Sequence, residues 1–463
     1  MAEMIKTDKG DFSKGSIPRA ILRLSLPLTL AQLINITYSI VDRIYLGRIP
    51  GAEHLALTGV GLAFPVIHIV MSIAALCGTG GGPLFSIERG KGNDREAERI
   101  MGNAFAMLLF FGAIVTTAIV IFRKPILYLF GASDDTYPYA GDYMAIYSIG
   151  SIFVMIALGM NPFINAQGFG RTGMMTIMVG AVINIILDPI FIFVFGLGVR
   201  GVALATVIAQ FFSALWVMRF LTGEKAMLRL KLSCMKIQAK RVRRILILGI
   251  SGFCMNITTS LTQIVSNVVL QRFGGDLYVG VMAIIGSIRE VIFMPVSGIQ
   301  NGLTPVIGYN YGAGLNDRVR SAIKFSTSAT VIYSVAVWSI VMLIPGTLIK
   351  IFSNEPALVT AGVPAMRIYY ALFVFMSLHM STQGVFLGLG KSKYAIFFSL
   401  LRKALIAAPL TIILPLMFGL GTNGVFIAEA ISHLISGLAC ITTMYIVVYR
   451  KLSKNPGHPG VSL

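Results

Sequence analysis

Apolar residues occur along the chain in long runs, and shorter polar segments separate one run from the next. A helix of about 20 apolar residues is long enough to cross the hydrocarbon core of a bilayer. We therefore expect an all-α integral membrane protein. The pattern predicts twelve transmembrane helices, at residues 20–46, 57–83, 100–122, 139–166, 173–199, 201–222, 245–271, 278–308, 325–349, 363–388, 394–418 and 422–449.

Composition and charge strengthen this interpretation. Only 12% of the 463 residues are charged, against about a quarter in a typical soluble domain. The formal net charge of +19 is also typical of nucleic-acid binding, but 27 of the 38 Lys and Arg residues fall in alternate loops, on the side of both termini. The positive-inside rule then places both termini in the cytoplasm and indicates contact with anionic lipid, not nucleic acid. The polar start of the chain predicts no cleavable signal peptide.

The two halves of the chain resemble each other. Three short blocks recur in the same order, at offsets of 222–223, 220 and 223 residues. Because each half has an even number of spans, we expect two six-helix bundles related by an axis along the membrane normal. The blocks are "PLFSIERGKGNDR" and "PVIGYNYGAGLNDR", "GFGRT" and "GLGKS", and "GLGVRGV" and "GLGTNGV". The predicted parts are a cytoplasmic segment 1–19, a lobe 20–222, a basic cytoplasmic linker 223–244, a lobe 245–449 and a cytoplasmic tail 450–463.

The first predicted helix of each half carries a polar stripe. Steps of three and four residues place the members of a stripe on one helix face. Lipid offers such groups no partners, so the stripes face protein or water: they either form interhelical hydrogen bonds or line a shared cavity. The stripes consist of Gln32, Asn35, Ser39 and Asp42, and of Asn256, Thr259, Gln263 and Ser266 at an offset of 224.

The fifth predicted span carries a single charge. Residues 174–199 are uncharged except for Asp188, and a charge at the centre of a span costs about 2.5–3.5 kcal/mol. Asn184 lies one turn earlier on the same face, and Pro189 should bend the helix beside this pair by releasing a backbone carbonyl. Thr206 in the next span can add a hydroxyl group.

Together with Asp42, these side chains form a candidate site for the ions H⁺ or Na⁺. Two carboxylates, an amide and a hydroxyl suit a small hard cation such as Na⁺, and two nearby acids in a low dielectric suit a proton equally well. The alternative for Asp42 is an ion pair with Arg43 at the end of its span. We interpret Asp42, Asn184, Asp188 and Thr206 as the cation-coupling site.

The second half has no acid at the positions that match Asp188, so ionic coupling is predicted in the first half only. Arg289 and Glu290 are adjacent within the eighth span, and Glu290 either contacts cationic cargo or pairs with another helix. Arg402 and Lys403 either extend their charged ends to the membrane surface or line water. Alternatively, they pair with Glu429 and His433, which lie four residues apart in the last span. His68 and His379 are interpreted as packing residues.

We also infer a substrate cleft. Asn161 and Asn165 flank Pro162 and either line this cleft or tie helices together. The sequence has no protease, phosphate-loop or nucleophile motif, so we expect neither an enzyme nor a cofactor other than the coupling ion. Numerous Met and Phe side chains suit a pliable cleft. The candidate cleft residues are Gln32, Asn35, Tyr38, Asn161, Asn165, Asn256, Gln263 and Glu290.

The sequence resembles the multidrug and toxin extrusion (MATE) family, in its bacterial branch of DinF- and MepA-type proteins. The resemblance rests on "SLPLTLAQLINITYSIVDRIYLG" (25–47), "NIILDPIFIFVFGLGVRGVALAT" (184–206) and "GYNYGAG" (308–314), with the six-plus-six layout and the basic linker. In that branch an Asp of the first helix, an Asn and Asp of the fifth and a Thr of the sixth form the cation site. Asp42, Asn184, Asp188 and Thr206 match these types.

The resemblance implies a MATE fold and an antiporter of the bacterial inner membrane. It would export small amphipathic, mostly cationic drugs and dyes in exchange for H⁺ or Na⁺ by alternating access. Two pseudo-symmetric lobes make a monomer sufficient. The alternative within transport is a flippase for lipids or lipid-linked precursors, which a wide, strongly cationic cavity would favour. A passive channel fits less well, because single acids inside helices suit stoichiometric coupling better than rings of charge do.

Overall fold

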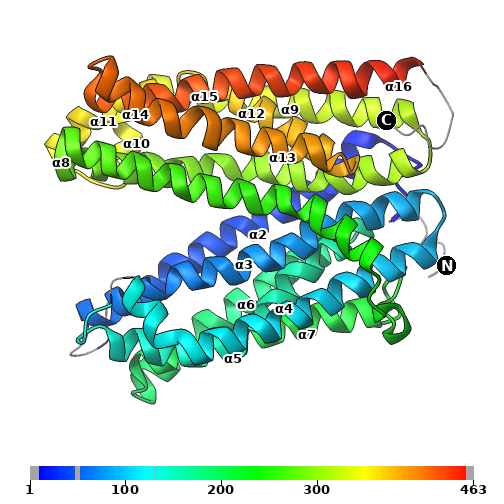
Figure 1. Ribbon diagram of the computed structural model, residues 1–463, viewed down its shortest axis with the longest axis horizontal. Coiled ribbons are helices and arrows are strands. Elements are labelled where there is room, and N and C mark those ends of the chain that lie inside the picture. Colours follow the sequence, from blue (N-terminus) through cyan, green and yellow to red (C-terminus); the bar gives the residue numbers. More distant parts are fainter. Residues whose placement is uncertain (1–9, 47–48, 50–52, 131, 455–463) are drawn as a thin grey trace. The chain divides into compact units, whose positions relative to one another are not determined.

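The computed structural model of the protein describes residues 10–46, 49, 53–130 and 132–454. Within these ranges every regular element is a helix (Figure 1). The chain divides into two compact units, one of residues 1–11 and 27–249 and one of residues 12–26 and 250–463. The all-α prediction is confirmed.

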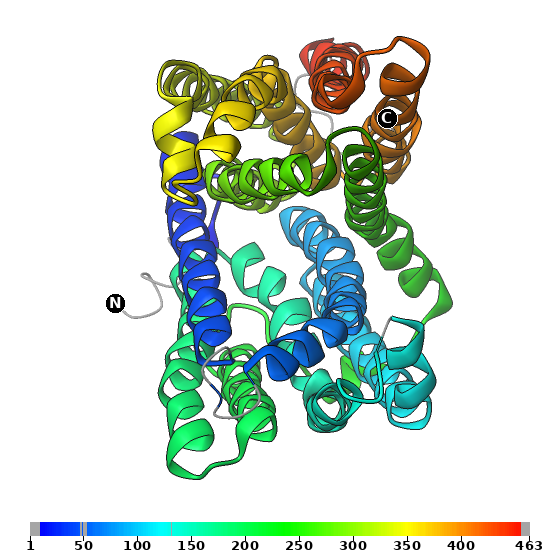
Figure 2. The same ribbon diagram turned by 90° about the vertical axis from the view of Figure 1, so that its left-hand side faces the viewer.

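Long helices that run alongside one another make up each unit, and Figure 2 views many of them nearly end-on. The helices that begin in the first half of the chain are α2 (Ile17–Leu46), α3 (Glu53–Gly90), α4 (Asp94–Leu129), α5 (Tyr137–Ala166), α6 (Gly170–Pro189), the π-helix η1 (Ile190–Val194), α7 (Gly198–Thr222) and the 3₁₀-helix η2 (Leu232–Met235). Those that follow are α8 (Ala239–Gly312), α9 (Asn316–Leu343), α10 (Pro345–Lys350), α11 (Pro356–Tyr370), α12 (Phe373–Gly388), α13 (Ser392–Leu400), the π-helix η3 (Leu401–Ala407), α14 (Ala408–Met417), α15 (Gly421–Met444), the π-helix η4 (Tyr445–Tyr449) and α16 (Arg450–Lys454).

The observed helices account for the twelve predicted spans. Ten helices of the described ranges are long and apolar enough to cross a membrane, and α11 and α12 form one further span that is bent by 47°. The helix α8 has 74 residues and would be about 110 Å long if straight, which is far more than one crossing needs. It is broken at Gly275, whose φ of 63° is outside the helical region, so α8 supplies two spans.

The first helix of each half starts in the unit formed mainly by the other half. Residues 12–26 belong to the second unit, and the start of α8 up to Gly249 belongs to the first. A Cβ atom at Gly80 would lie 2.1 Å from the carbonyl oxygen of Ile245, and one at Gly302 would lie 2.9 Å from that of Ile21. Only glycine permits this close approach of two helix backbones. The two contacts correspond to each other, because Gly80 and Gly302 are 222 residues apart.

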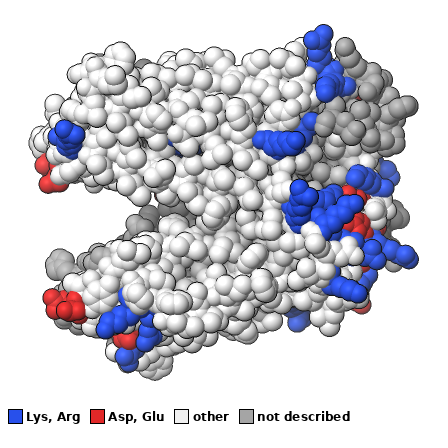
Figure 3. All heavy atoms as spheres, viewed as in Figure 1, with Lys and Arg blue, Asp and Glu red and all other residues white. Residues whose placement is uncertain are grey.

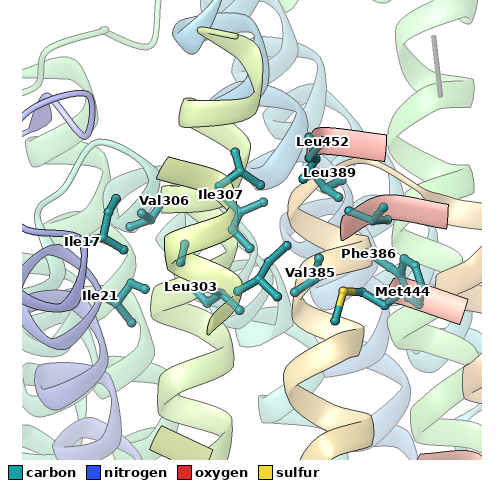
Figure 4. Close-up of a cluster of buried hydrophobic side chains, with 14 of the residues drawn as sticks. Ile17, Ile21, Leu303, Val306, Ile307, Val385, Phe386, Leu389, Met444 and Leu452 are labelled. Atoms are coloured by element: carbon teal, nitrogen blue, oxygen red, sulfur yellow. The ribbon is translucent and has the colours of Figure 1, made fainter. Parts of the chain in front are cut away.

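Apolar packing holds the start of α2 in the second unit. Ile17 and Ile21 lie beside Leu303 and Val306 of α8 (Figure 4). The guanidinium of Arg318 adds hydrogen bonds to the carbonyl oxygens of Phe12, Lys14 and Gly15, at 2.8–3.2 Å. The boundary predicted at residue 20 differs from this division, because the segment before it packs together with the beginning of α2.

Left-handed glycines mark the turns of both repeats. Gly92 and Gly314 have φ values of 74° and 72°, and Gly168 and Gly390 have values of 88° and 67°. The second pair corrects the offset of 220 to 222, because the turn glycine of "GFGRT" is its first residue and that of "GLGKS" is its third. A side chain is strained at positive φ, so these turns require glycine in both halves.

The basic linker packs against α4 in the first unit. Arg241 forms a paired contact with Glu96, with both N–O distances at 2.7 Å, and Lys231 contacts Glu98 at 2.8 Å. Asn103 of α4 adds hydrogen bonds within the linker: its Nδ2 donates to the carbonyl oxygens of Cys234 and Lys236, and its Oδ1 accepts from the backbone N–H of Gln238. The linker therefore belongs to the first unit and is held there by carboxylates of the same unit.

The sides of the helices carry almost no charge on the face drawn in Figure 3, where Lys, Arg, Asp and Glu gather at the helix ends. Large apolar side chains such as Leu26, Phe122 and Val194 are exposed on the described surface. Such a surface is stable against lipid and unfavourable in water, so the helices span a membrane.

Candidate cation site in the first unit

The site is built around Asp188, which is completely buried near the end of α6. Asn184 lies one turn earlier, and its Nδ2 donates to Oδ1 of Asp188 at 3.2 Å and to Oγ1 of Thr206 on α7 at 3.4 Å. The sequence spacing placed Asn184 and Asp188 on one face, and helix packing adds Thr206 to them. The helix continues past Pro189 as the π-helix η1, a wide turn that is often found at functional sites.

Asp42 of α2 completes the group. Its carboxyl lies within hydrogen-bonding reach of the carboxyl of Asp188. Two ionised carboxylates repel each other and neither can donate, so a proton or a cation between them would relieve this repulsion. Oδ2 of Asp188 and Oδ1 of Asn184 are buried and accept no hydrogen bond from any described residue. These oxygens can ligate a small cation or, in the case of the carboxylate, take a proton. The side chain of Arg43, the alternative partner of Asp42, lies outside the described side chains.

Two tyrosines, Tyr38 and Tyr143, lie near the acids, and a third, Tyr147, packs beside them. Tyr143 of α5 hydrogen-bonds to Thr206 and stacks on Tyr147, with ring centroids 5.8 Å apart. Tyr38 lies one turn before Asp42 and interacts electrostatically with both carboxyl groups. Sequence reasoning named Tyr38 but missed Tyr143 and Tyr147. Their spacing of four residues in an apolar span was the available signal.

A cavity of about 60 Å³ opens beside this group. Asn35 and Tyr38 from α2, Asn161 from α5, Asn184 and Thr206 line part of it. A buried water needs roughly 10–15 Å³, whereas sites for drug-sized ligands have roughly 300–1,000 Å³. The cavity therefore suits an ion with a few waters, and cargo requires a wider opening.

The predicted cleft residues separate into two groups. Asn35, Tyr38 and Asn161 line the cavity, and Asn161 also donates to the carbonyl of Gly173 at 3.1 Å, so it ties α5 to α6 as well. Asn165 is buried beside the same glycine. Gln32 is half-buried on α2 and is not part of the cavity wall.

The remaining cleft residues belong to the second unit. Gln263 donates to Asn267 at 3.1 Å, and Glu290 is exposed and forms no ion pair with a described residue. The side chain of Asn256 lies outside the described side chains. The structure therefore brings together the four predicted coupling residues, but it does not bring together all eight predicted cleft residues. Across the described ranges, no group of three or more His, Cys, Asp and Glu side chains could hold a metal.

A family model named MatE matches residues 27–190 and 253–413. The chain belongs to the MatE family. The two matched segments correspond to the two repeats, and the predicted family membership is confirmed.

Proteins similar to this MatE chain include the multidrug export protein MepA of Staphylococcus aureus (strain NCTC 8325 / PS 47), which is 24% identical over 94% of this chain and 95% of MepA. MepA of Staphylococcus haemolyticus (strain JCSC1435) is 25% identical over 95% and 94% of the two chains. A crystal structure of MATE in the bent conformation has a TM-score of 0.91 at 22% identity and covers 97% of this chain and 100% of that one. The protein is a MatE-family membrane transport protein and not an enzyme.

Proposed function

We propose that the protein is a secondary active multidrug efflux antiporter. It exports small amphipathic, mostly cationic drugs and dyes across the bacterial inner membrane in exchange for H⁺ or Na⁺, and it works as a monomer with both termini in the cytoplasm. The contact between the carboxyl groups of Asp42 and Asp188, in a buried group with Asn184 and Thr206, carries this proposal. The relatives named multidrug export proteins support the choice of cargo.

The site supplies a means of coupling. When Asp42 and Asp188 are both ionised, their repulsion pushes α2 and α6 apart; a proton or Na⁺ removes that repulsion and lets the helices close. Only a ligand that binds two conformations with different affinity can shift their equilibrium, and the ion does so here through the distance between these acids. Closing of α2 changes the cavity wall at Asn35 and Tyr38, and the cargo then no longer binds there.

The cavity of the first unit does not have the lining that the flippase alternative would favour. Its wall consists of neutral polar and apolar side chains and contains neither Lys nor Arg. A strongly cationic cavity, which anionic lipid headgroups would need, is therefore not found at this place.

The test is dye efflux from proteoliposomes under an imposed pH gradient or Na⁺ gradient, each applied separately. Wild-type protein should export dye under at least one gradient, and Asp188→Asn should abolish that efflux because a neutral amide cannot exchange a proton or hold Na⁺ by charge. Asp142→Asn is the matched control, since it removes an acid of the same unit whose contact with Arg200 is exposed. Full efflux by Asp188→Asn would refute the mechanism.

A further inference from the structure

The second unit contains a buried cluster of basic side chains. Arg402 and Lys403 of η3 are 5% and 2% exposed, and Arg289 of α8 lies within Coulombic range of both. Facing them is Glu429 of α15, whose Oε1 lies 2.6 Å from Nζ of Lys403. Nε2 of His433 is 3.5 Å from the other carboxylate oxygen. The predicted pairing of Glu429 with a basic residue is thus present in the structure.

The charges of this cluster do not balance. Three basic side chains face one carboxylate, which leaves an excess of two positive charges while the histidines are neutral. Lys403 occupies that carboxylate, and Arg289 donates to the hydroxyl of Tyr369 at 3.3 Å. Arg402 forms no hydrogen bond or ion pair with any side chain in the described part of the chain.

The residues of this cluster occupy the positions that correspond, in the other repeat, to the wall of the cation-site cavity. An offset of 222 matches Arg402 with Gly180 and Lys403 with Ala181, and both of these small residues line the first cavity. The further matches are His379 with Ala157 at 222, Glu429 with Thr206 at 223 and His433 with Gln210 at 223. His379, interpreted from the sequence as a packing residue, lies within Coulombic range of Arg402 and His433.

Burying a charge is unfavourable unless a partner compensates for it. A lipid-embedded protein that keeps an unpaired guanidinium therefore indicates an external partner of opposite charge. Arginine matches planar oxyanions best, because its guanidinium donates two parallel hydrogen bonds. Arg402 also lies in a π-helix, which widens the turn at this point. Arg289 is partly exposed, whereas Arg402 and Lys403 are buried.

We propose that Arg402 and Arg289 bind a carboxylate or similar oxyanion carried by the transported amphiphile. The ion pair of Lys403 and Glu429 holds η3 against α15 and so positions Arg402. This proposal rests on the proposed export function only in that the cargo supplies the anion. It extends the cargo from simple cations to zwitterionic amphiphiles.

The test compares two dyes that share one scaffold. Rhodamine B carries a free carboxylate and is a zwitterion, whereas its ethyl ester is a cation. Binding is measured by fluorescence polarisation with the full-length protein in phosphatidylcholine nanodiscs, which contain no anionic lipid. Wild-type protein should bind the free carboxylate more tightly, and Arg402→Gln should weaken that binding roughly 10- to 100-fold, the loss expected for a bidentate charged contact. Binding of the ester should change less than about twofold, because the ester accepts only weak hydrogen bonds.

Further variants keep the test decisive. Arg289→Gln should also weaken carboxylate binding, Arg402→Lys should retain part of it, and Arg367→Gln should retain all of it because that arginine is exposed on α11. Each variant must elute as a monodisperse peak before it is used. Equal affinity of wild type for the two dyes, binding of neither, or an equal loss of both in Arg402→Gln would overturn the proposal.

Equilibrium binding needs no ion gradient, so it is read independently of coupling. If wild-type protein shows the dye preference but no gradient drives efflux, the antiport function fails and the oxyanion site stands. If efflux of the ester depends on Asp188 but the dyes bind equally, the oxyanion site fails and the antiport function stands.

Discussion

The two repeats use one scaffold for opposite charges. In the first unit, Asp42 and Asp188 share a buried group with neutral polar side chains and a small cavity. In the second, basic side chains occupy the positions that match the cavity walls. Corresponding turn glycines and corresponding helix contacts show that the backbone is shared. Duplication therefore preserved the packing, while the buried polar positions diverged.

This difference has a physical consequence for transport. In the mechanism we propose, the site with two acids binds a cation and changes its charge when it does so, whereas the cluster with excess positive charge binds an anion. One repeat is thus suited to sense the ion gradient, and the other is suited to recognise a constant feature of the cargo.

The largest effect on stability should follow from Glu429→Gln. It leaves Lys403 buried without its partner, and breaking a buried ion pair in this way costs about 3–5 kcal/mol. The matched change in the first unit, Thr206→Val, should cost only about 1–2 kcal/mol, because it removes two neutral hydrogen bonds, to Asn184 and Tyr143. Thermal unfolding in detergent would measure both, and equal losses would contradict the contrast between the units. The double variant Lys403→Met/Glu429→Gln should recover part of the loss.

A smaller effect should follow from Gly80→Ala and Gly302→Ala. Both insert a Cβ atom where two helix backbones meet, and overpacking of this kind typically costs about 1–3 kcal/mol. Comparable decreases in the unfolding temperature of the two variants would support the conclusion that the two repeats share one scaffold. Gly61→Ala is the control, since a Cβ there meets open space. A tolerated Gly80→Ala together with a damaging Gly302→Ala would contradict that view.

The smallest effect should follow from Asn184→Ala under an imposed Na⁺ gradient. This variant loses one oxygen ligand and the donor that orients Asp188, so the Na⁺ concentration for half-maximal efflux should rise about tenfold, which corresponds to about 1.4 kcal/mol. Efflux at saturating Na⁺ should persist. An unchanged Na⁺ dependence would show that Asn184 is not part of the site. Asn165→Ala is the control: Asn165 lies outside the cavity wall, so this variant should leave the Na⁺ dependence unaltered.

The amino-acid sequence by itself determines the helical spans of this protein, the helix faces of some site residues and the internal repeat. Lipid cannot satisfy free backbone groups, so runs of apolar residues must form helices, and the spans could be predicted from hydropathy. Helical periodicity likewise places Asn184 and Asp188 on one face. The repeat is visible directly as recurring turn glycines, whose positive φ excludes other residues.

Contacts between helices were decided by the tertiary structure alone. The approach of Asp42 to Asp188, the position of Tyr143 beside Thr206 and the packing of residues 12–26 in the second unit join segments that are far apart in the chain. The size of the cavity and the excess charge around Arg402 also depend on which faces meet. Hydropathy specifies that a helix forms and how long it is, but close packing of side chains from distant segments selects its neighbours.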